Sequence, residues 1–226
     1  MGIVEKIPLF SALAEEQRAG LEPQLLCKVF QDNEMIFDFE DASRDVLFIL
    51  SGKVRVLYRS VLGREVILAD LEAPEFFGEL AAIDEQARSA NVTALQRTEI
   101  AICPQAVFLN LATHVPAISE ALLKTLTARI RALDARFSEM SVLKSNERLY
   151  AELLRLSRPR ASQRGQRIIS PPPLHHHLAA RIGCRREVVS RELSRLMKQG
   201  ILEKTRGGLV LVDVAVLEAR LAKALS

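Results

Sequence analysis

The chain lacks the features of exported and membrane proteins. Its 226 residues contain no tryptophan and only three cysteines, and Cys27, Cys103 and Cys184 are too few and too widely spaced for a disulfide framework or a zinc knuckle. No segment approaches the roughly 20 apolar residues of a membrane helix, and Glu5 and Lys6 stand where a signal peptide would be apolar. We therefore expect a protein of the reducing cytoplasm that has no membrane partner.

The composition favours two folded domains. Hydrophobic residues make up 49% of the chain and charged residues 26%, which supplies enough apolar surface to offset the entropy lost on folding. The length exceeds what one ordinary domain needs and is comfortable for two.

Charge is distributed unevenly along the chain. Residues 1–110 hold 10 Lys and Arg against 18 Asp and Glu, a net charge of −8, whereas residues 111–226 hold 21 against 10, a net charge of +11. Such asymmetry is typical of a protein whose basic end meets a polyanion. Unevenly charged solvent-exposed faces would give the same net charges. Sequence motifs are therefore needed to distinguish a polyanion-binding end from such faces.

The acidic part has the pattern of an all-β roll. Short runs rich in β-branched and aromatic residues alternate with turns between about residues 25 and 104, and such spacing predicts a sandwich or barrel-like roll. We expect strands at Met35–Phe37, Val46–Leu50, Lys53–Tyr58, Val66–Leu71, Ala90–Leu95 and Glu99–Ile102, and a helix within Ala12–Leu25.

A heptad pattern follows the predicted roll. Apolar residues recur at alternating steps of three and four on a segment rich in helix formers, which predicts one long helix at residues 116–144. Such a seam usually closes against a second copy of itself as a parallel dimer, and the alternative is that it packs on its own roll. The seam residues are Leu123, Leu126, Ile130, Leu133, Phe137 and Met140.

The basic end has the pattern of a winged helix-turn-helix. Ser145 and Asn146 are good caps for a helix at Glu147–Leu156. Further on, Gly183 and Cys184 separate two short helical segments, and an alternating hairpin and a closing amphipathic helix follow. The expected elements are helices at Leu174–Arg181 and Arg185–Gln199, and strands at Ile201–Lys204 and Leu209–Val212.

These patterns predict an α+β protein with three parts. Residues 1–115 are expected to form a jelly-roll-like β-roll domain, residues 116–144 a dimerisation helix, and residues 145–226 a winged helix-turn-helix domain.

The segment around Gly78 has the residues of a phosphate and ribose site. Gly78 lets the backbone approach a ligand, and the helix start that follows favours an anion. The guanidinium of Arg88 matches two phosphate oxygens, the hydroxyl of Ser89 adds a donor, and Glu79 accepts hydrogen bonds from a sugar hydroxyl. The alternative is a Glu79–Arg88 ion pair that braces a loop without any ligand.

The chain as a whole resembles the CRP/FNR (catabolite activator) family of bacterial transcription regulators, and its first part resembles a cyclic-nucleotide-binding domain. The resemblance covers nearly the full length and rests on Ile7-Pro8-Leu9-Phe10, on Phe48 to Val54, and on Phe77-Gly78-Glu79-Leu80 with Arg88-Ser89-Ala90. It implies that Gly78 and Ser89 contact a cyclic phosphate and that Arg88 neutralises its charge. It also implies that Glu79 holds the ribose 2′-hydroxyl and that Leu80, in the same motif, belongs to the effector site.

The resemblance leaves the effector open between two alternatives. Arg136 and Phe137 stand where cAMP-responsive members carry a small polar pair that reads the purine. Phe137 either stacks on a base of cAMP or cGMP, or plugs the pocket and makes the regulator independent of ligand. The family also implies RNA polymerase as a partner. We expect no tightly bound cofactor, because no cysteine or histidine of this chain matches a haem or iron–sulfur motif.

The second helix of the predicted motif carries the candidate DNA contacts. Residues 145–226 hold 16 Lys and Arg against 7 Asp and Glu, a net charge of +9, as expected for a duplex binder. Arg186, Glu187, Ser190 and Arg191 lie near the helix start, where arginine reads guanine and glutamate reads cytosine in the major groove of a pseudo-palindromic site. The alternative for Glu187 and Arg191 is a simple i, i+4 surface pair.

Other basic residues of this domain are expected to contact DNA phosphates and not to bind a metal. Arg185 is a poor helix cap and is expected to reach a phosphate instead, as are His175 and His176. Three consecutive histidines on a helix point in different directions, so we expect no metal site among them. No nucleophile–base pair is evident, and we expect no enzymatic activity.

Overall fold

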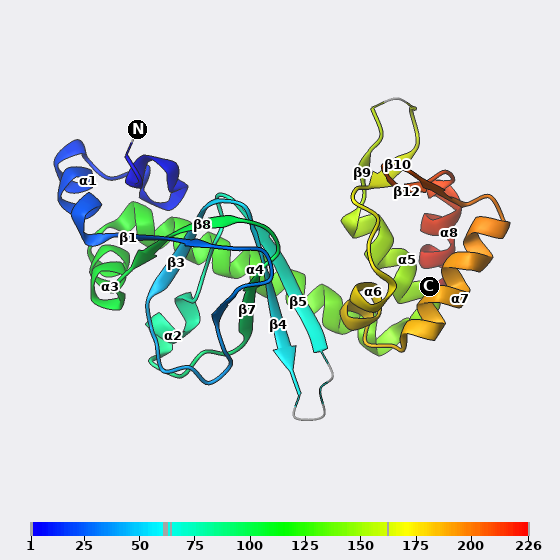
Figure 1. Cartoon of the computed structure of the whole chain (residues 1–226), viewed down its shortest axis with the longest axis horizontal. Coiled ribbons are helices and arrows are strands. Elements are labelled where there is room, and N and C mark those ends of the chain that lie inside the picture. Colours follow the sequence, from blue (N-terminus) through cyan, green and yellow to red (C-terminus); the bar gives the residue numbers. More distant parts are fainter. Residues whose placement is uncertain (1, 61–62, 64, 162, 226) are drawn as a thin grey trace. The chain divides into compact units, whose positions relative to one another are not determined.

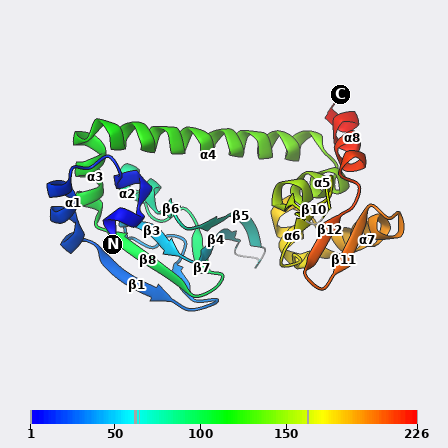
Figure 2. The ribbon, with the colours of Figure 1, turned by 90° about the horizontal axis from the view of Figure 1, so that it is seen from above.

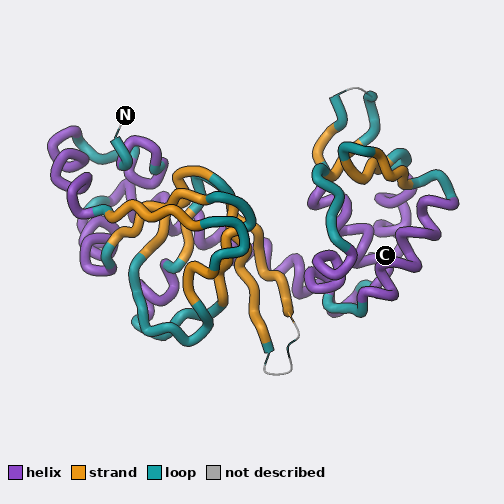
Figure 3. Tube along the Cα trace, viewed as in Figure 1, coloured by secondary structure: helices purple, strands orange, loops and turns teal. Residues whose placement is uncertain are grey.

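The computed structural model describes residues 2–60, 63, 65–161 and 163–225. The chain divides into two compact units, residues 1–130 and 131–226. Figure 1 labels most of their elements, and Figure 3 shows that the first unit holds most of the strands while the second consists mainly of helices with a small sheet.

The first unit is the β-roll that the sequence predicts. Its strands are β1 (Leu26–Phe30), β2 (Met35–Phe37), β3 (Val46–Ser51), β4 (Lys53–Arg59), β5 (Glu65–Glu72), β6 (Phe76–Phe77), β7 (Asn91–Ala94) and β8 (Thr98–Cys103). Short helices accompany them, namely η1 (Val4–Lys6), η2 (Pro8–Phe10), α1 (Glu15–Leu21), η3 (Glu22–Gln24), α2 (Glu79–Asp84) and α3 (Gln105–His114). The sequence patterns did not predict β1, β6 or α3.

Two antiparallel sheets enclose the core of the roll. One has the strand order β1-β8-β3-β6 and the other β2-β7-β4-β5. Strand β3 is buried on both faces: Leu47 and Ile49 face the core between the sheets, whereas Val46 and Phe48 face a second core that lies under the helices. This explains the nearly continuous apolar sequence of β3, because successive side chains of a strand point to opposite faces.

Helix α4 (Pro116–Val142) follows the roll and appears as one unbroken helix in Figure 2. Near its start, Ile118 and Leu122 are buried in the second core of the first unit, and Leu126 packs partly against it. The remaining seam residues are exposed by more than half of their surface: Leu123 64%, Ile130 57%, Leu133 58%, Phe137 74% and Met140 54%. The alternative that the seam packs on its own roll therefore holds for Leu126 alone.

The second unit contains the winged helix-turn-helix that the sequence predicts. Its helices are α5 (Ser145–Leu156), α6 (His175–Ile182), α7 (Arg186–Lys198) and α8 (Val214–Leu225). Its sheet has the order β11-β12-β10-β9, formed by β9 (Arg158–Pro159), β10 (Arg167–Ile169), β11 (Leu202–Thr205) and β12 (Gly208–Leu211). Apolar residues of all four helices and of the sheet form one core.

The start of α5 differs from the prediction. Ser145 and Asn146 are the first helical residues rather than caps, and Lys144 occupies the cap position. The carboxylate of Glu147 accepts a hydrogen bond from the backbone N–H of Lys144 at 2.7 Å. A glutamate at the third helical position can cap a helix in this way by reaching back to the residue before it.

Within the described residues, no single helix combines the length and hydropathy needed to cross a membrane. Helices α3 and α4 meet these criteria only together, across a bend of 105°. Phe108, Ile118 and Leu122 of this pair are buried in the core of the first unit.

Candidate effector-binding and DNA-binding sites

Gly78 joins β6 to α2 in a conformation that favours glycine. Its φ is +85°, in the left-handed region that other residues rarely adopt. The surrounding space is equally restrictive, because a Cβ added to Gly78 would lie 2.6 Å from Nη1 of Arg88 and 3.0 Å from the carbonyl oxygen of Asp45. Glycine therefore lets the backbone pass close to the Arg88 guanidinium.

Arg88 is a buried cation held from several sides, with only 3% of its surface exposed. Its Nη1 donates to the carbonyl of Gly78 at 3.0 Å, its Nη2 to the carbonyl of Asp45 at 2.9 Å, and its Nε to Oγ of Ser43 at 3.1 Å. The guanidinium carbon lies 4.2 Å from the centre of the Phe37 ring, a cation–π contact. Burial lowers the pKa of Arg88, and nearby carboxylates oppose that shift.

Glu79 pairs with a residue that the sequence patterns did not single out. Its Oε1 accepts a hydrogen bond from Nη1 of Arg129 on α4 at 2.6 Å, and Nη2 of Arg129 donates to the carbonyl of Phe76 at 2.5 Å. Glu79 is 4% exposed, so Arg129 supplies the counter-charge that a buried carboxylate needs. Within the described residues, the ion pair of Glu79 is with Arg129 and not with Arg88, which corrects the alternative of a Glu79–Arg88 brace.

The structure gathers part of the predicted effector site. Gly78, Glu79 and Arg88 lie together, Ser89 is exposed beside Arg88, and Leu80 is 49% exposed on α2.

Two further candidates lie on the part of α4 that belongs to the second unit. There Nη2 of Arg136 donates to the carbonyl of Arg181 at 3.2 Å, while Phe137 is 74% exposed. The effector role of Arg136 and Phe137 stays a prediction.

The helix-turn-helix has the turn that the sequence predicts. Gly183 ends α6 with a φ of +63°, and Arg185 caps α7 without a side-chain capping bond. Along α7, Val189, Leu193 and Leu196 are buried against the core, which leaves the opposite face in solvent. Arg186, Glu187 and Arg191 lie on that exposed face, and their contact with DNA stays a prediction.

Two other candidate DNA contacts bind each other. Nδ1 of His175 lies 2.7 Å from Oγ of Ser190, which joins the start of α6 to α7. Burial lowers the pKa of His175, and the positive charges of Arg186 and Lys204 lower it further. His176 is exposed beside His177. Among the candidate DNA contacts, the His175–Ser190 pair is thus already engaged within the protein.

Comparison with known proteins agrees with this architecture. Residues 27–114 match the model of the cyclic nucleotide-binding domain, and residues 147–220 match the Crp-like helix-turn-helix domain. The chain is 30% identical to the "Cyclic AMP receptor protein" of Thermus thermophilus over 93% of this chain and 95% of that protein. The chain belongs to the CRP/FNR family of transcription regulators.

Further proteins show a similar likeness. A "CRP-like cAMP-activated global transcriptional regulator" of Mycobacterium tuberculosis is 24% identical over 98% of this chain and 99% of that protein. Among solved structures, a CooA mutant from Carboxydothermus hydrogenoformans matches with a TM-score of 0.76 at 21% identity over 89% of each chain. A CRP/FNR regulator of Eubacterium rectale matches with a TM-score of 0.74 at 18% identity over 96% of this chain and 99% of that chain. The Crp-like helix-turn-helix match and the 30% identical relative identify this CRP/FNR protein as a DNA-binding transcription regulator.

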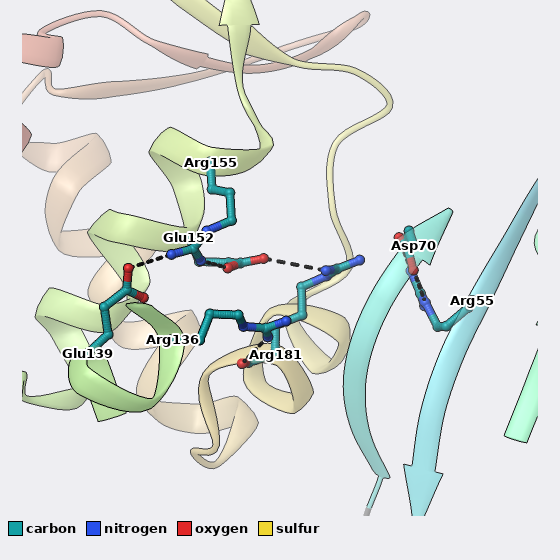
Figure 4. A network of polar contacts seen from close by, with 7 residues as sticks. All are labelled: Arg55, Asp70, Arg136, Glu139, Glu152, Arg155 and Arg181. Atoms are coloured by element: carbon teal, nitrogen blue, oxygen red, sulfur yellow. Dashed lines mark hydrogen bonds and ion pairs between the residues drawn. The ribbon is translucent and has the colours of Figure 1, made fainter. Parts of the chain in front are cut away.

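A polar network in the second unit was not predicted from the sequence. Figure 4 shows Glu152 of α5, which is 1% exposed, between Arg155 and Arg181. Arg155 donates to Glu152 through Nη1 and to Glu139 of α4 through Nη2, the latter at 2.5 Å, and Nη1 of Arg181 lies 3.5 Å from Glu152. Arg136 adds its bond to the carbonyl of Arg181. The network ties the last turns of α4 to α5 and α6, and so to the DNA-binding motif.

Proposed function

We propose that this CRP/FNR regulator is a homodimer that binds a pseudo-palindromic DNA site under the control of a cyclic nucleotide, cAMP or cGMP, held in the β-roll. The observation that carries the effector assignment is the buried guanidinium of Arg88 beside the left-handed Gly78. Arginine forks bind phosphate in a bidentate manner, and two of the five N–H groups of Arg88 remain after its bonds to Gly78, Asp45 and Ser43. The names of the relatives, which include a cyclic AMP receptor protein, also support a cyclic nucleotide.

One observation favours a second candidate, a regulator whose pocket is vestigial and which binds DNA without ligand. All three guanidinium nitrogens of Arg88 already donate hydrogen bonds within the roll. An arginine whose bonds are satisfied by its own loop can serve a purely structural role. The two candidates differ in whether a cyclic nucleotide binds, and not in the DNA-binding role.

Calorimetry separates the two candidates. The full-length chain is titrated with cAMP, with cGMP and with 5′-AMP, which carries an open phosphate. We expect saturable binding of a cyclic nucleotide, and at least tenfold weaker binding by Arg88→Gln because the charge opposite the phosphate is lost. Arg97→Gln, a matched change at an exposed arginine of the same unit, should bind as the unchanged chain does. If neither cyclic nucleotide binds at millimolar concentration, the effector proposal fails and the ligand-independent candidate replaces it.

The homodimer proposal rests on the exposed part of the seam. Leu123, Ile130, Leu133, Phe137 and Met140 are large apolar side chains left in solvent along one side of α4. A second α4 would cover them in the manner of a coiled coil. A two-fold pair of recognition helices would then meet major-groove half-sites about 34–36 Å apart, which implies a pseudo-palindrome.

The DNA proposal assigns base contacts to the exposed face of α7. We assign guanine contacts to Arg186 and Arg191, a cytosine contact to Glu187, a further base contact to Ser190, and phosphate contacts to Arg185, His175 and His176. Selection from a randomised duplex pool would first define the half-site. Arg191→Ala should then cost about 1–3 kcal/mol at the cognate site, and Arg158→Ala, an exposed arginine of β9, is the matched control. An equal loss on random duplex would show that Arg191 contacts phosphate only.

The remaining parts of the proposal follow from the family. We propose RNA polymerase as the protein partner and the cytoplasm as the location. The proposal needs no metal and no tightly bound cofactor, because the effector itself is the switch. Co-purification with RNA polymerase on promoter DNA that carries the selected site would test this partner. If RNA polymerase does not co-purify, the proposed partnership is wrong, while the effector and DNA proposals are unaffected.

A further inference from the structure

The first unit contains a cavity that is separate from the candidate effector site. It lies between the N-terminal 3₁₀ helices, β3, β6 and the first turns of α4, and its volume is about 290 Å³. This is close to the lower end of the volumes of small-molecule sites, about 300–1,000 Å³. None of the candidate effector residues Gly78, Glu79, Leu80, Arg88 and Ser89 lines it.

The walls of the cavity are mainly apolar. Ile7 and Leu9 come from the N-terminal segment, Phe48 from β3, Phe76 from β6 and Ala121 from α4. The rings of Phe48 and Phe76 are in contact, with centres 5.6 Å apart and planes tilted by 43°. Both belong to the buried core, so the cavity is bounded by packed side chains. Such walls favour a compact apolar or aromatic body.

Arg129 adds a cation to this apolar wall, and its guanidinium carbon lies 4.9 Å from the centre of the Phe76 ring. Its side chain is 29% exposed, and its bonds within the described residues are those from Nη1 to Glu79 and from Nη2 to the carbonyl of Phe76. A guanidinium has five N–H groups, so Nε–H and one N–H on each terminal nitrogen remain as donors. They suit an acceptor that carries negative charge, above all a carboxylate.

The acidic residues near the cavity do not exclude an anion. Glu75 at the rim is exposed, and its carboxylate accepts a hydrogen bond from the backbone N–H of Glu72 at 3.0 Å. Glu79 already pairs with Arg129. Elsewhere in this protein Arg155 bonds two carboxylates at once, Glu139 and Glu152, with Arg181 as a further cation on Glu152. The geometry of a guanidinium therefore allows a second carboxylate to bind beside the first.

We propose that this cavity is a binding site for a small apolar carboxylate, such as an aryl-alkanoate. The apolar body lies against Phe48 and Phe76, and the carboxylate accepts N–H groups of Arg129. Because Arg129 also holds Glu79, such a ligand acts one residue away from the candidate effector site, which suits a second regulatory input. The binding itself does not depend on a cyclic nucleotide or on dimer formation.

Calorimetry on the full-length chain tests the site with a matched pair of probes. The first probe is 3-phenylpropionate, and the second is 3-phenylpropanamide, which has the same shape without the charge. We expect saturable binding of the carboxylate and at least tenfold weaker binding of the amide. No saturable binding of the carboxylate at about 5 mM, the range of a weak fragment, would overturn the proposal, and equal binding of both probes would overturn the assignment of a carboxylate.

Two variants locate the binding. Ala121→Phe fills the cavity from α4 and should raise the Kd of 3-phenylpropionate at least tenfold, while Ala128→Phe, the same change at an exposed position of α4, should leave it within twofold. Arg129→Gln should abolish the preference for the carboxylate over the amide. Arg131→Gln, at an exposed arginine of α4, should preserve that preference.

The variants also separate a failed site from a failed fold. Circular dichroism and the thermal midpoint report whether Ala121→Phe is folded, and Arg129→Gln tests the site without filling the core. Unchanged binding in either folded variant would overturn the assignment. Loss of cyclic-nucleotide binding with retained 3-phenylpropionate binding would instead count against the proposed effector, so the two failures are distinguishable.

Discussion

Leu133→Ala is a direct test of the seam of α4. Leu133 is 58% exposed and lies midway along the predicted interface. The substitution removes three carbon atoms from a side chain that contributes little to the fold of its own chain. If the seam pairs two copies of α4, the change weakens the dimer and leaves the free energy of unfolding of the monomer nearly unchanged.

The magnitude follows from the exposed surface. Burial of one methylene stabilises by about 0.8 kcal/mol, so full burial of the three carbons would contribute about 2.4 kcal/mol. Since 58% of the residue's surface remains to be covered, the loss is about 1.4 kcal/mol for each chain. A two-fold interface contains the position twice, which gives about 3 kcal/mol and a rise of about 100-fold in the dimer Kd.

Sedimentation equilibrium over a range of protein concentrations measures this Kd. Leu26→Ala is the matched control, because Leu26 on β1 is 65% exposed but lies outside the seam. It should leave the dimer Kd within about twofold. A monomeric unchanged chain would refute the dimer, and an equal effect of the two substitutions would refute the role of the seam.

Three further predictions concern stability and reactivity. Glu152→Ala should lower the free energy of unfolding by about 3 kcal/mol in urea titrations, because it removes a buried carboxylate that both Arg155 and Arg181 contact. The lowered pKa of His175 means that the folded state resists its protonation, so stability should fall as pH drops below the ordinary histidine value of about 6.5, and His175→Gln should reduce that fall. Burial raises the pKa of the Cys103 thiol to about 12, so Ellman's reagent should modify the exposed Cys27 in the folded protein and Cys103 only after unfolding.

Matched controls accompany these predictions. Glu187→Ala removes an exposed carboxylate and should change the unfolding free energy by less than about 0.5 kcal/mol. An equally small effect of Glu152→Ala would mean that the buried carboxylate contributes no net stability. His176→Gln removes an exposed imidazole, and it would contradict the assignment to His175 if it flattened the pH dependence equally. Rapid modification of Cys103 in the folded chain would contradict its burial.

Periodic patterns in the sequence correctly predicted the elements with strong local signals. Strand β3, helix α4 and the turn at Gly183 follow from a short apolar run, from a run of helix formers and from a glycine between two helical segments. Each depends on residues close together in the chain. The weak elements escaped this reasoning: β1 has only Phe30 buried, and β6 is two residues long.

The candidate effector site was predicted in part. The motif around Gly78 and Arg88 is visible because its residues are near each other in sequence. Arg129, which neutralises Glu79, is separated from it by 50 residues and resembles any other arginine of a polar helix. Choosing it requires knowing which side of α4 faces the roll.

Local pattern and family resemblance together were thus sufficient for the family and the class of fold, whereas the predicted domain bounds and the candidate DNA contacts stay predictions. The partners of buried charges came only from the folded chain, as the Arg129–Glu79 pair and the arginines around Glu152 illustrate. The same holds for the cavity beside Phe48 and Phe76. The physical reason is that hydrophobic periodicity is a property of neighbouring residues, whereas a buried charge is stabilised by whichever opposite charge the packing of distant segments brings within a few ångströms.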